Sequence, residues 1–160
     1  MQPATSQKPA KFLVCATDCE SSRTALRLAC KKAQRRGDKI DILTVIEPAS
    51  FQPLFSVADK ISNERREQAE VILQGLAKTA YEESGIYPTL HLREGNPGEQ
   101  ILAAVMEDSD INMIVLGVSP QSKSDGKLIN WLSERSGDSL LVPLMLVPGN
   151  LTDQQIEALA

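Results

Sequence analysis

Five short apolar runs alternate with segments of helical character, and this alternation restricts the fold more than any other feature of the chain. The runs have the length of strands, and most are apolar at successive positions, as in strands buried on both faces of a sheet. They cover residues 12–16, 39–46, 89–93, 111–117 and 143–148. Because parallel neighbouring strands need a crossover between them, the pattern predicts a parallel α/β sheet with helices on both faces.

We therefore expect a single doubly wound domain whose five-stranded parallel sheet has the strand order 3-2-1-4-5. Residues 1–10 are predicted to form a flexible arm, residues 11–148 the domain, and residues 149–160 a C-terminal helical tail. A chain of 160 residues is long enough to bury a core of this kind without disulfide bonds.

Local signals predict where the helices begin. Ser21 or Ser22 can cap the first helix. Asn96, followed by Pro97 and Glu99, is typical of a helix start. The other helices are expected near residues 57–84 and 127–140 and after a capping box that joins Thr152 to Gln155.

Charge and hydropathy exclude several classes of partner. The chain has 17 Lys and Arg residues against 21 Asp and Glu residues, a net charge of −4. That balance argues against a non-specific nucleic-acid binder, which needs a basic surface. No apolar run approaches the roughly 18–20 residues that a membrane span needs, and the N-terminus lacks the apolar core of a signal peptide. We expect a cytoplasmic protein with no nucleic-acid or membrane partner.

Three cysteines, Cys15, Cys19 and Cys30, are expected to be free thiols in a reducing compartment. A metal site is not expected, because His91 is the only histidine and the cysteines lack the clustered spacing of zinc ligands. Cys19 is the candidate reactive thiol, since the turn before a helix places it at the positive end of the helix dipole. Its acidic neighbours Asp18 and Glu20 oppose this effect.

Ligands of open parallel sheets bind beyond the carboxyl ends of the strands. Asp18 follows the first apolar run directly, so its carboxylate is a candidate to bond a sugar hydroxyl or a purine edge. The same side chain is equally suited to capping the following helix. Motifs for nucleophilic hydrolysis, P-loop phosphate binding and dinucleotide binding are missing, and we assign no catalytic residue.

Five segments, taken in order, resemble the universal stress protein family. They are Leu13-Val14-Cys15-Ala16-Thr17-Asp18, Leu43-Thr44-Val45-Ile46-Glu47-Pro48, Gly95-Asn96-Pro97 with Ile101, the segment from Asp110 to Gly117, and Val142-Pro143-Leu144-Met145-Leu146-Val147. Together they extend over nearly the whole of residues 11–148. The resemblance implies a stress-response protein of the same fold.

Members of that family that bind ATP carry a Gly-x2-Gly-x9-Gly-Ser/Thr loop after the fourth strand. Here Gly117 is the first glycine, but Pro120, Asn130 and Trp131 replace the remaining positions. Proline has no N–H to offer a phosphate, and tryptophan fills space that a phosphate would need. The resemblance therefore implies the subgroup that does not bind ATP. Asp18, Val45 and Gly117 remain as positions that could hold an adenosine weakly, and ATP or AMP is expected to bind at most weakly.

The resulting expectation is a protein that acts by binding and dimerisation, without catalytic turnover. The resemblance implies a homodimer through the strand from Leu144 to Val147, whose apolar side chains would otherwise form an exposed edge. In the alternative, the C-terminal helix covers that edge, and a regulatory protein is a further candidate partner. Two other functions stay open: an adenine-nucleotide binder with a divergent loop and slow ATP hydrolysis, and a thiol redox responder that uses Cys19.

Overall fold

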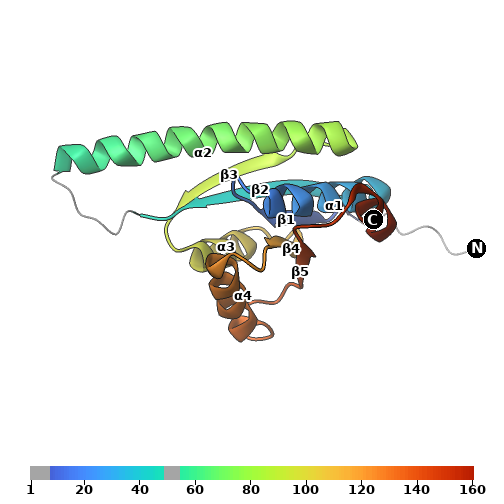
Figure 1. The fold of residues 1–160 in the computed structure, drawn as a ribbon. Coiled ribbons are helices and arrows are strands. Elements are labelled where there is room, and N and C mark those ends of the chain that lie inside the picture. The colour runs from blue at the N-terminus through green and yellow to red at the C-terminus, as the bar shows by residue number, and fades with distance from the viewer. Residues whose placement is uncertain (1–7, 49–54) are drawn as a thin grey trace, which may run out of the picture.

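Five parallel strands form one sheet in the order β3-β2-β1-β4-β5, as expected (Figure 1). The computed structural model describes residues 8–48 and 55–160, and within the second helix it describes side chains from residue 62 onward. The elements are β1 (Lys11–Cys15), α1 (Glu20–Arg36), β2 (Lys39–Ile46), α2 (Phe55–Ser84), β3 (Thr89–Glu94), α3 (Pro97–Glu107), β4 (Ile111–Val118), α4 (Lys123–Arg135), β5 (Leu144–Pro148) and α5 (Asp153–Leu159). The predicted arm lies mostly outside the described residues.

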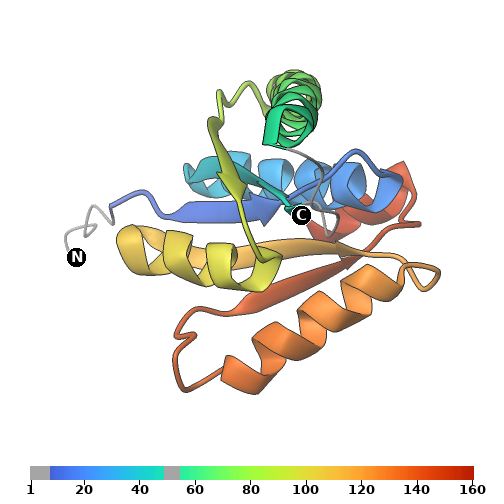
Figure 2. The ribbon, with the colours of Figure 1, turned by 90° about the vertical axis from the view of Figure 1, so that its left-hand side faces the viewer.

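Two apolar layers hold the sheet between its helices. Side chains from α1, α2 and α5 pack on one face with alternate residues of the strands, Phe12 and Val14 among them. Side chains from α3 and α4 pack on the other face with Leu13 and Leu43. Figure 2 shows α1 and α2 on one side of the sheet and α3 and α4 on the other. The doubly wound prediction is confirmed, because neighbouring residues of the central strands are buried on opposite faces.

Two predicted helix starts are wrong. Cys19 is the N-cap residue of α1, without a side-chain bond, and Ser21 and Ser22 lie buried in the first turn. Ser22 Oγ instead accepts a hydrogen bond from Thr17 N at 3.0 Å, which closes the turn between β1 and α1. The fourth helix begins four residues earlier than expected, because the Ser122 side chain accepts from Asp125 N and caps it there.

The other two predicted caps are confirmed. Asn96 Oδ1 accepts from Glu99 N at 3.1 Å with Pro97 in the first turn of α3. Thr152 and Gln155 form a complete capping box at the start of α5. The C-terminal segment is also packed, since Ile156 is fully buried in the same core layer as α1.

The strand order leaves β3 and β5 at the two edges of the sheet. On β5, Val147 is buried but Leu146 remains 45 % exposed, so the C-terminal helix does not bury this side chain. None of the helices that the structure describes is long and apolar enough to cross a membrane.

Candidate functional site

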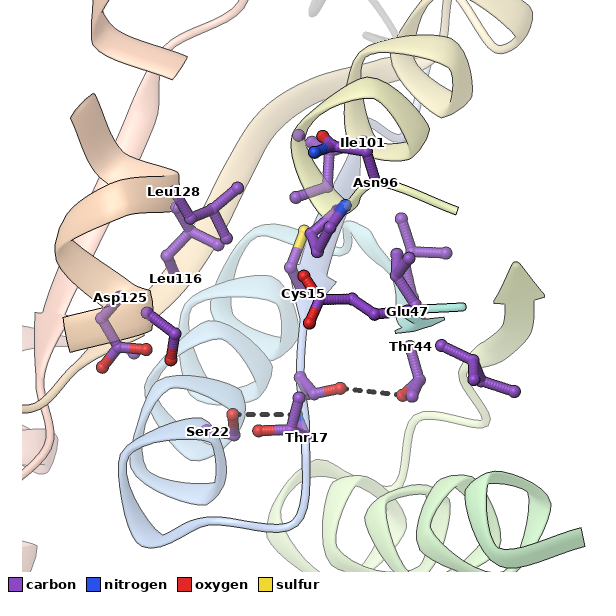
Figure 3. Close-up of a pocket in the computed structure, with 18 of the residues that line it drawn as sticks. Cys15, Thr17, Ser22, Thr44, Glu47, Asn96, Ile101, Leu116, Asp125 and Leu128 are labelled. Atoms are coloured by element: carbon purple, nitrogen blue, oxygen red, sulfur yellow. Dashed lines mark hydrogen bonds between the residues drawn. The ribbon is translucent and has the colours of Figure 1, made fainter. Parts of the chain in front are cut away.

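The main pocket lies at the carboxyl ends of β1, β2 and β4 and has a volume of about 620 Å³. The strand order reverses between β1 and β4, because β2 lies on one side of β1 and β4 on the other. Ligands of open parallel sheets bind at such a switch point. Residues of α2, α3 and α4 form the remaining walls, so every layer of the fold contributes to the pocket (Figure 3).

The inner part of the pocket is mainly apolar. Its apolar lining side chains come from strands and helices: Ala16, Leu43, Val45, Ile46, Ala69, Ile72, Pro97, Ile101, Leu116, Leu128 and Ile129. Of the polar residues in this region, Thr44 Oγ1 donates to Ala16 O at 2.8 Å, and Ser22 Oγ accepts from Thr17 N. Both bonds appear in Figure 3. These side chains therefore hold the turn after β1 in place beside an apolar floor that suits a flat ring.

Of the residues that the structure describes, four with charged side chains line the pocket: Glu47, Arg65, Asp125 and Lys127. The Glu47 side chain extends from the end of β2 toward the middle of the pocket (Figure 3). Its carboxylate has no hydrogen bond or ion pair to any residue that the structure describes. Arg65 Nη1 instead donates to the main-chain oxygen of Glu47 at 2.9 Å. Among the described side chains the two positive and two negative groups balance, so these four groups do not form a basic site for a polyphosphate.

The loop after β4 is occupied by a carboxylate of the protein itself. Asp125 Oδ2 accepts a hydrogen bond from Ser119 N at 3.0 Å, and Asp125 N donates to Ser122 Oγ. In a phosphate-binding loop, main-chain N–H groups and the first turn of the helix face the anion. Here Asp125 takes the Ser119 N–H and places its own negative charge in that turn, so these residues do not fit a triphosphate.

Gly117 has a steric role in this structure. A β-carbon at residue 117 would lie 2.1 Å from the main-chain oxygen of Ser21, in the first turn of α1. Gly149 faces the same residue, because a β-carbon there would lie 2.6 Å from Ser21 Cβ. The glycine that matched the first position of the loop motif is therefore needed for α1 to approach β4.

Trp131 lines the pocket and closes part of its wall. The indole ring of Trp131 packs on Gly98 at the start of α3. The guanidinium of Arg135, also on α4, lies 3.5 Å from the centroid of that ring. Arg135 Nη1 also donates to Trp131 O at 2.9 Å. Pro120 and Asn130, the other two altered positions, are not among the residues that line the pocket.

The sequence-predicted adenosine positions are only partly brought together. Val45 and Gly117 line the pocket. Asp18 lies outside it, with its side chain 67 % exposed and paired to Arg23 Nη1 at 2.8 Å. It borders a second hollow with Glu64 and Glu67 of α2.

Cys19 is surrounded by hydroxyl groups. Its Sγ lies 3.4 Å from Thr17 Oγ1 and 3.2 Å from the Oγ atoms of Ser21 and Ser22. Partial burial raises the pKa of the Cys19 thiol, but its hydrogen bonds with the side chains of Ser21, Ser22 and Thr17 outweigh that effect and lower the pKa overall. Burial alone raises the pKa of Cys15, and it dominates at Cys30, so both reach about 12. Cys19 is therefore the thiol that ionises most readily.

Sequence reasoning missed the roles of Glu47 and Asp125. Glu47 was placed only at the end of a strand, and nothing local tells which way its side chain points. For Asp125 a signal existed, because Ser122 and Asp125 have the spacing of a capping box. Among the described residues, no group of three or more His, Cys, Asp or Glu side chains could hold a metal ion.

Comparisons with known proteins agree with one another. The model of the universal stress protein family matches residues 10–148. The solved universal stress protein UspA from Lactobacillus plantarum is 16 % identical with a TM-score of 0.73, covering 88 % of this chain and 98 % of its own. No curated protein matches this chain.

Two other similar structures were solved with a nucleotide. A family protein from Arabidopsis thaliana with AMP bound is 15 % identical with a TM-score of 0.61, covering 88 % of this chain and 92 % of its own. The universal stress protein from Archaeoglobus fulgidus in complex with dAMP is 17 % identical with a TM-score of 0.57, covering 88 % and 98 %. At these identities the likeness shows the fold.

Proposed function

The chain belongs to the universal stress protein family, and we propose that it is a cytoplasmic stress-response protein that binds a nucleoside-like ligand without gripping or hydrolysing a triphosphate. Related structures hold AMP and dAMP, which supports a nucleoside-sized ligand at the ends of the strands. The apolar pocket of about 620 Å³ at the switch point has the size and position for one.

The bond from Ser119 N to Asp125 carries the proposal. A phosphate at this place would have to displace the carboxylate from its donor and then lie next to a like charge. Charge-assisted hydrogen bonds contribute about 1.5–3 kcal/mol each, so the loss of such donors separates a nucleotide binder from a nucleoside binder. Pro120 removes one further donor from the same loop.

Isothermal calorimetry that compares each purine nucleoside with its own triphosphate tests this function. Adenosine is paired with Mg-ATP, and guanosine with Mg-GTP. We expect at least one nucleoside to bind and neither triphosphate to bind more tightly than its nucleoside. Asp125→Ala should improve the affinity for the triphosphates relative to the nucleosides, because it frees the Ser119 N–H and removes a negative charge.

Glu134→Ala is the matched control, since its side chain lies on the same helix, is 77 % exposed and does not line the pocket. A triphosphate that binds the unaltered protein tenfold more tightly than its nucleoside would show that the loop still grips phosphates. Mg-ATP that is consumed with turnover would support the alternative of an adenine-nucleotide enzyme.

The proposal includes a homodimer joined through β5. Unpaired edge strands with apolar side chains promote association, and Leu146 leaves such a surface open on this edge. A second copy pairing there would satisfy the free main-chain groups of β5. A regulatory protein is a further candidate partner of this dimer. Binding of such a partner would change the oligomeric state of the assembly, and that change is its test.

A second candidate function is a thiol redox responder, favoured by the lowered pKa of Cys19 among three hydroxyl groups. Its test is the oligomeric state after treatment with hydrogen peroxide. A change that disappears in Cys19→Ser would support it, and an unchanged oligomeric state would count against it.

A further inference from the structure

Glu47 is an exposed residue at the carboxyl end of β2, and its carboxylate accepts no hydrogen bond from the described part of the protein. The main chain at this point is anchored, because Gly95 N donates to Ile46 O at 2.9 Å and Arg65 Nη1 donates to Glu47 O. The side chain extends from that anchored end of β2 into the pocket (Figure 3). A carboxylate that a ligand covers must be given hydrogen-bond donors, since a buried charge without partners is strongly unfavourable.

The apolar lining of the pocket that this carboxylate faces favours a flat ring as the group that covers it. Val45, Ile72, Pro97 and Ile101 are among the apolar residues that line this pocket with Glu47. An ionised carboxylate only accepts hydrogen bonds, through two oxygen atoms. A ring with two adjacent N–H donors on one edge meets both oxygen atoms at once, and such paired bonds are the strong and directional kind.

The two purines differ at this edge. Guanine presents the N1 and N2 donors side by side, whereas adenine presents the N6 donor beside the N1 acceptor. The N1 acceptor of adenine would face a carboxylate oxygen with no proton between them. We propose that Glu47 reads the edge of a heterocycle with two adjacent N–H donors, as in guanine, so that the pocket selects guanosine over adenosine. This inference rests on the proposed nucleoside-binding function and names the base.

Calorimetric titration of the full chain with guanosine, inosine and adenosine tests the selection. Guanosine should bind more tightly than adenosine by a factor of about ten or greater, since a good bidentate pair discriminates between bases by about that factor. Inosine, which keeps the N1 donor but lacks the 2-amino group, should fall between them. Biopterin carries the same pair of donors on a different ring, so its titration distinguishes a pterin from a guanine nucleoside as the source.

Glu47→Gln supplies the decisive variant, because an amide has one acceptor and one donor at nearly the same shape. The variant should lower the affinity for guanosine by about tenfold and raise the affinity for adenosine, because the amide complements the donor and acceptor of the adenine edge. Glu64→Gln is the control, since Glu64 lies on α2 outside the main pocket. An unchanged melting temperature in both variants shows that they are folded.

The outcomes separate the two proposals. Adenosine that binds as tightly as guanosine, or guanosine affinity that survives Glu47→Gln, would overturn the selection and leave the nucleoside-binding function standing. If none of the three nucleosides binds, the proposed function itself fails. Biopterin that binds more tightly than guanosine and is weakened by Glu47→Gln would support the edge recognition and assign the ligand to the pterins.

Discussion

The indole ring of Trp131 lies directly against Gly98, so that a β-carbon at residue 98 would be 2.5 Å from Trp131 Cε3. Gly98 is buried in the first turn of α3, and Trp131 lies on α4. This contact joins the two helices that cover one face of the sheet, and it forms a corner of the main pocket. The position of α4 therefore depends on residue 98 of α3 being a glycine, which has no β-carbon.

Gly98→Ala should destabilise the protein by about 1–3 kcal/mol, because the indole must move away from the new methyl group. Urea unfolding measures the change in the free energy of unfolding. Gly75→Ala is the control, because residue 75 lies inside α2 with open space around it. Alanine there should raise the free energy of unfolding by about 0.5–1 kcal/mol. A Gly98→Ala protein as stable as the Gly75→Ala protein would contradict the contact.

Gly117→Ala should lower the free energy of unfolding by about 3 kcal/mol or more, since the new β-carbon would meet main-chain atoms of Ser21 that cannot rotate aside. Gly126→Ala, on α4 with no atom within 4 Å of the new carbon, should be neutral or stabilising. Thermal unfolding without any ligand measures both. Had Gly117 served only to admit a phosphate, its replacement would leave the ligand-free stability unchanged.

Cys19 should be alkylated first, and its labelling rate should rise at a lower pH than the rate of an ordinary cysteine does. The pKa of Cys19 is lowered, so more of it is thiolate at neutral pH than of an ordinary cysteine. Cys15 and Cys30, with pKa values of about 12, should stay unlabelled in the folded protein. Timed alkylation with peptide mapping across pH 6–10 is the measurement.

Ser22→Ala should raise the pKa of Cys19 and slow its labelling at neutral pH, because the side-chain hydrogen bond with Ser22, which lowers this pKa, is lost. Ser124→Ala is the matched control, because the Ser124 hydroxyl is hydrogen-bonded to Ser122 and not to Cys19. Equal labelling of all three cysteines in the native protein would refute the assignment.

Stability should fall as the pH drops below about 4.5, the range in which unfolded carboxyl groups take up protons. Hydrogen bonds from Arg93, Lys11 and Lys31 lower the pKa values of Glu107, Asp108 and Glu157, respectively. These groups have lower pKa values in the folded state, so their contribution is present above the unfolded pKa values and is lost as the pH falls through the folded ones.

Lys11→Met removes the partner of Asp108, whose bond to Lys11 Nζ is 2.6 Å, and should flatten this acid dependence. Lys39→Met replaces an exposed lysine at the start of the neighbouring strand and should leave the dependence as it was. The measurement is the melting temperature of each variant from pH 3 to pH 7. If the melting temperature has the same slope against pH in both variants, Asp108 has no role in the acid dependence.

Leu146→Asp should convert the proposed dimer to a monomer, because a charge on the edge strand prevents apolar pairing there. Leu159→Asp is the control, since Leu159 is 51 % exposed and belongs to α5 rather than to the edge strand. Sedimentation at micromolar concentration measures both. An unaltered protein that sediments as a monomer of about 17.5 kDa would rule out the dimer.

Most of the fold could be predicted because its signals are local. Apolar runs such as residues 111–117 are long enough for a buried strand, and Asn96 and Thr152 cap helices through bonds to residues three positions away. Ser21 and Ser22 failed as caps because β1 ends at Cys15 and the turn is closed by Thr17 N, so the serines fall inside the helix. Less of the site could be predicted, since Asp18 has the right place in the sequence but its side chain pairs with Arg23.

The sequence by itself determined the order of strands and helices and the replacement of three phosphate-loop positions by Pro120, Asn130 and Trp131. Only the tertiary structure decided what took the place of that loop. Trp131 meets Gly98, Gly117 meets Ser21, and Glu47 extends toward the pocket because helices from distant parts of the chain pack at one edge of the sheet. Such contacts depend on how rigid elements dock, and side-chain direction at a docked surface is not encoded in local propensity.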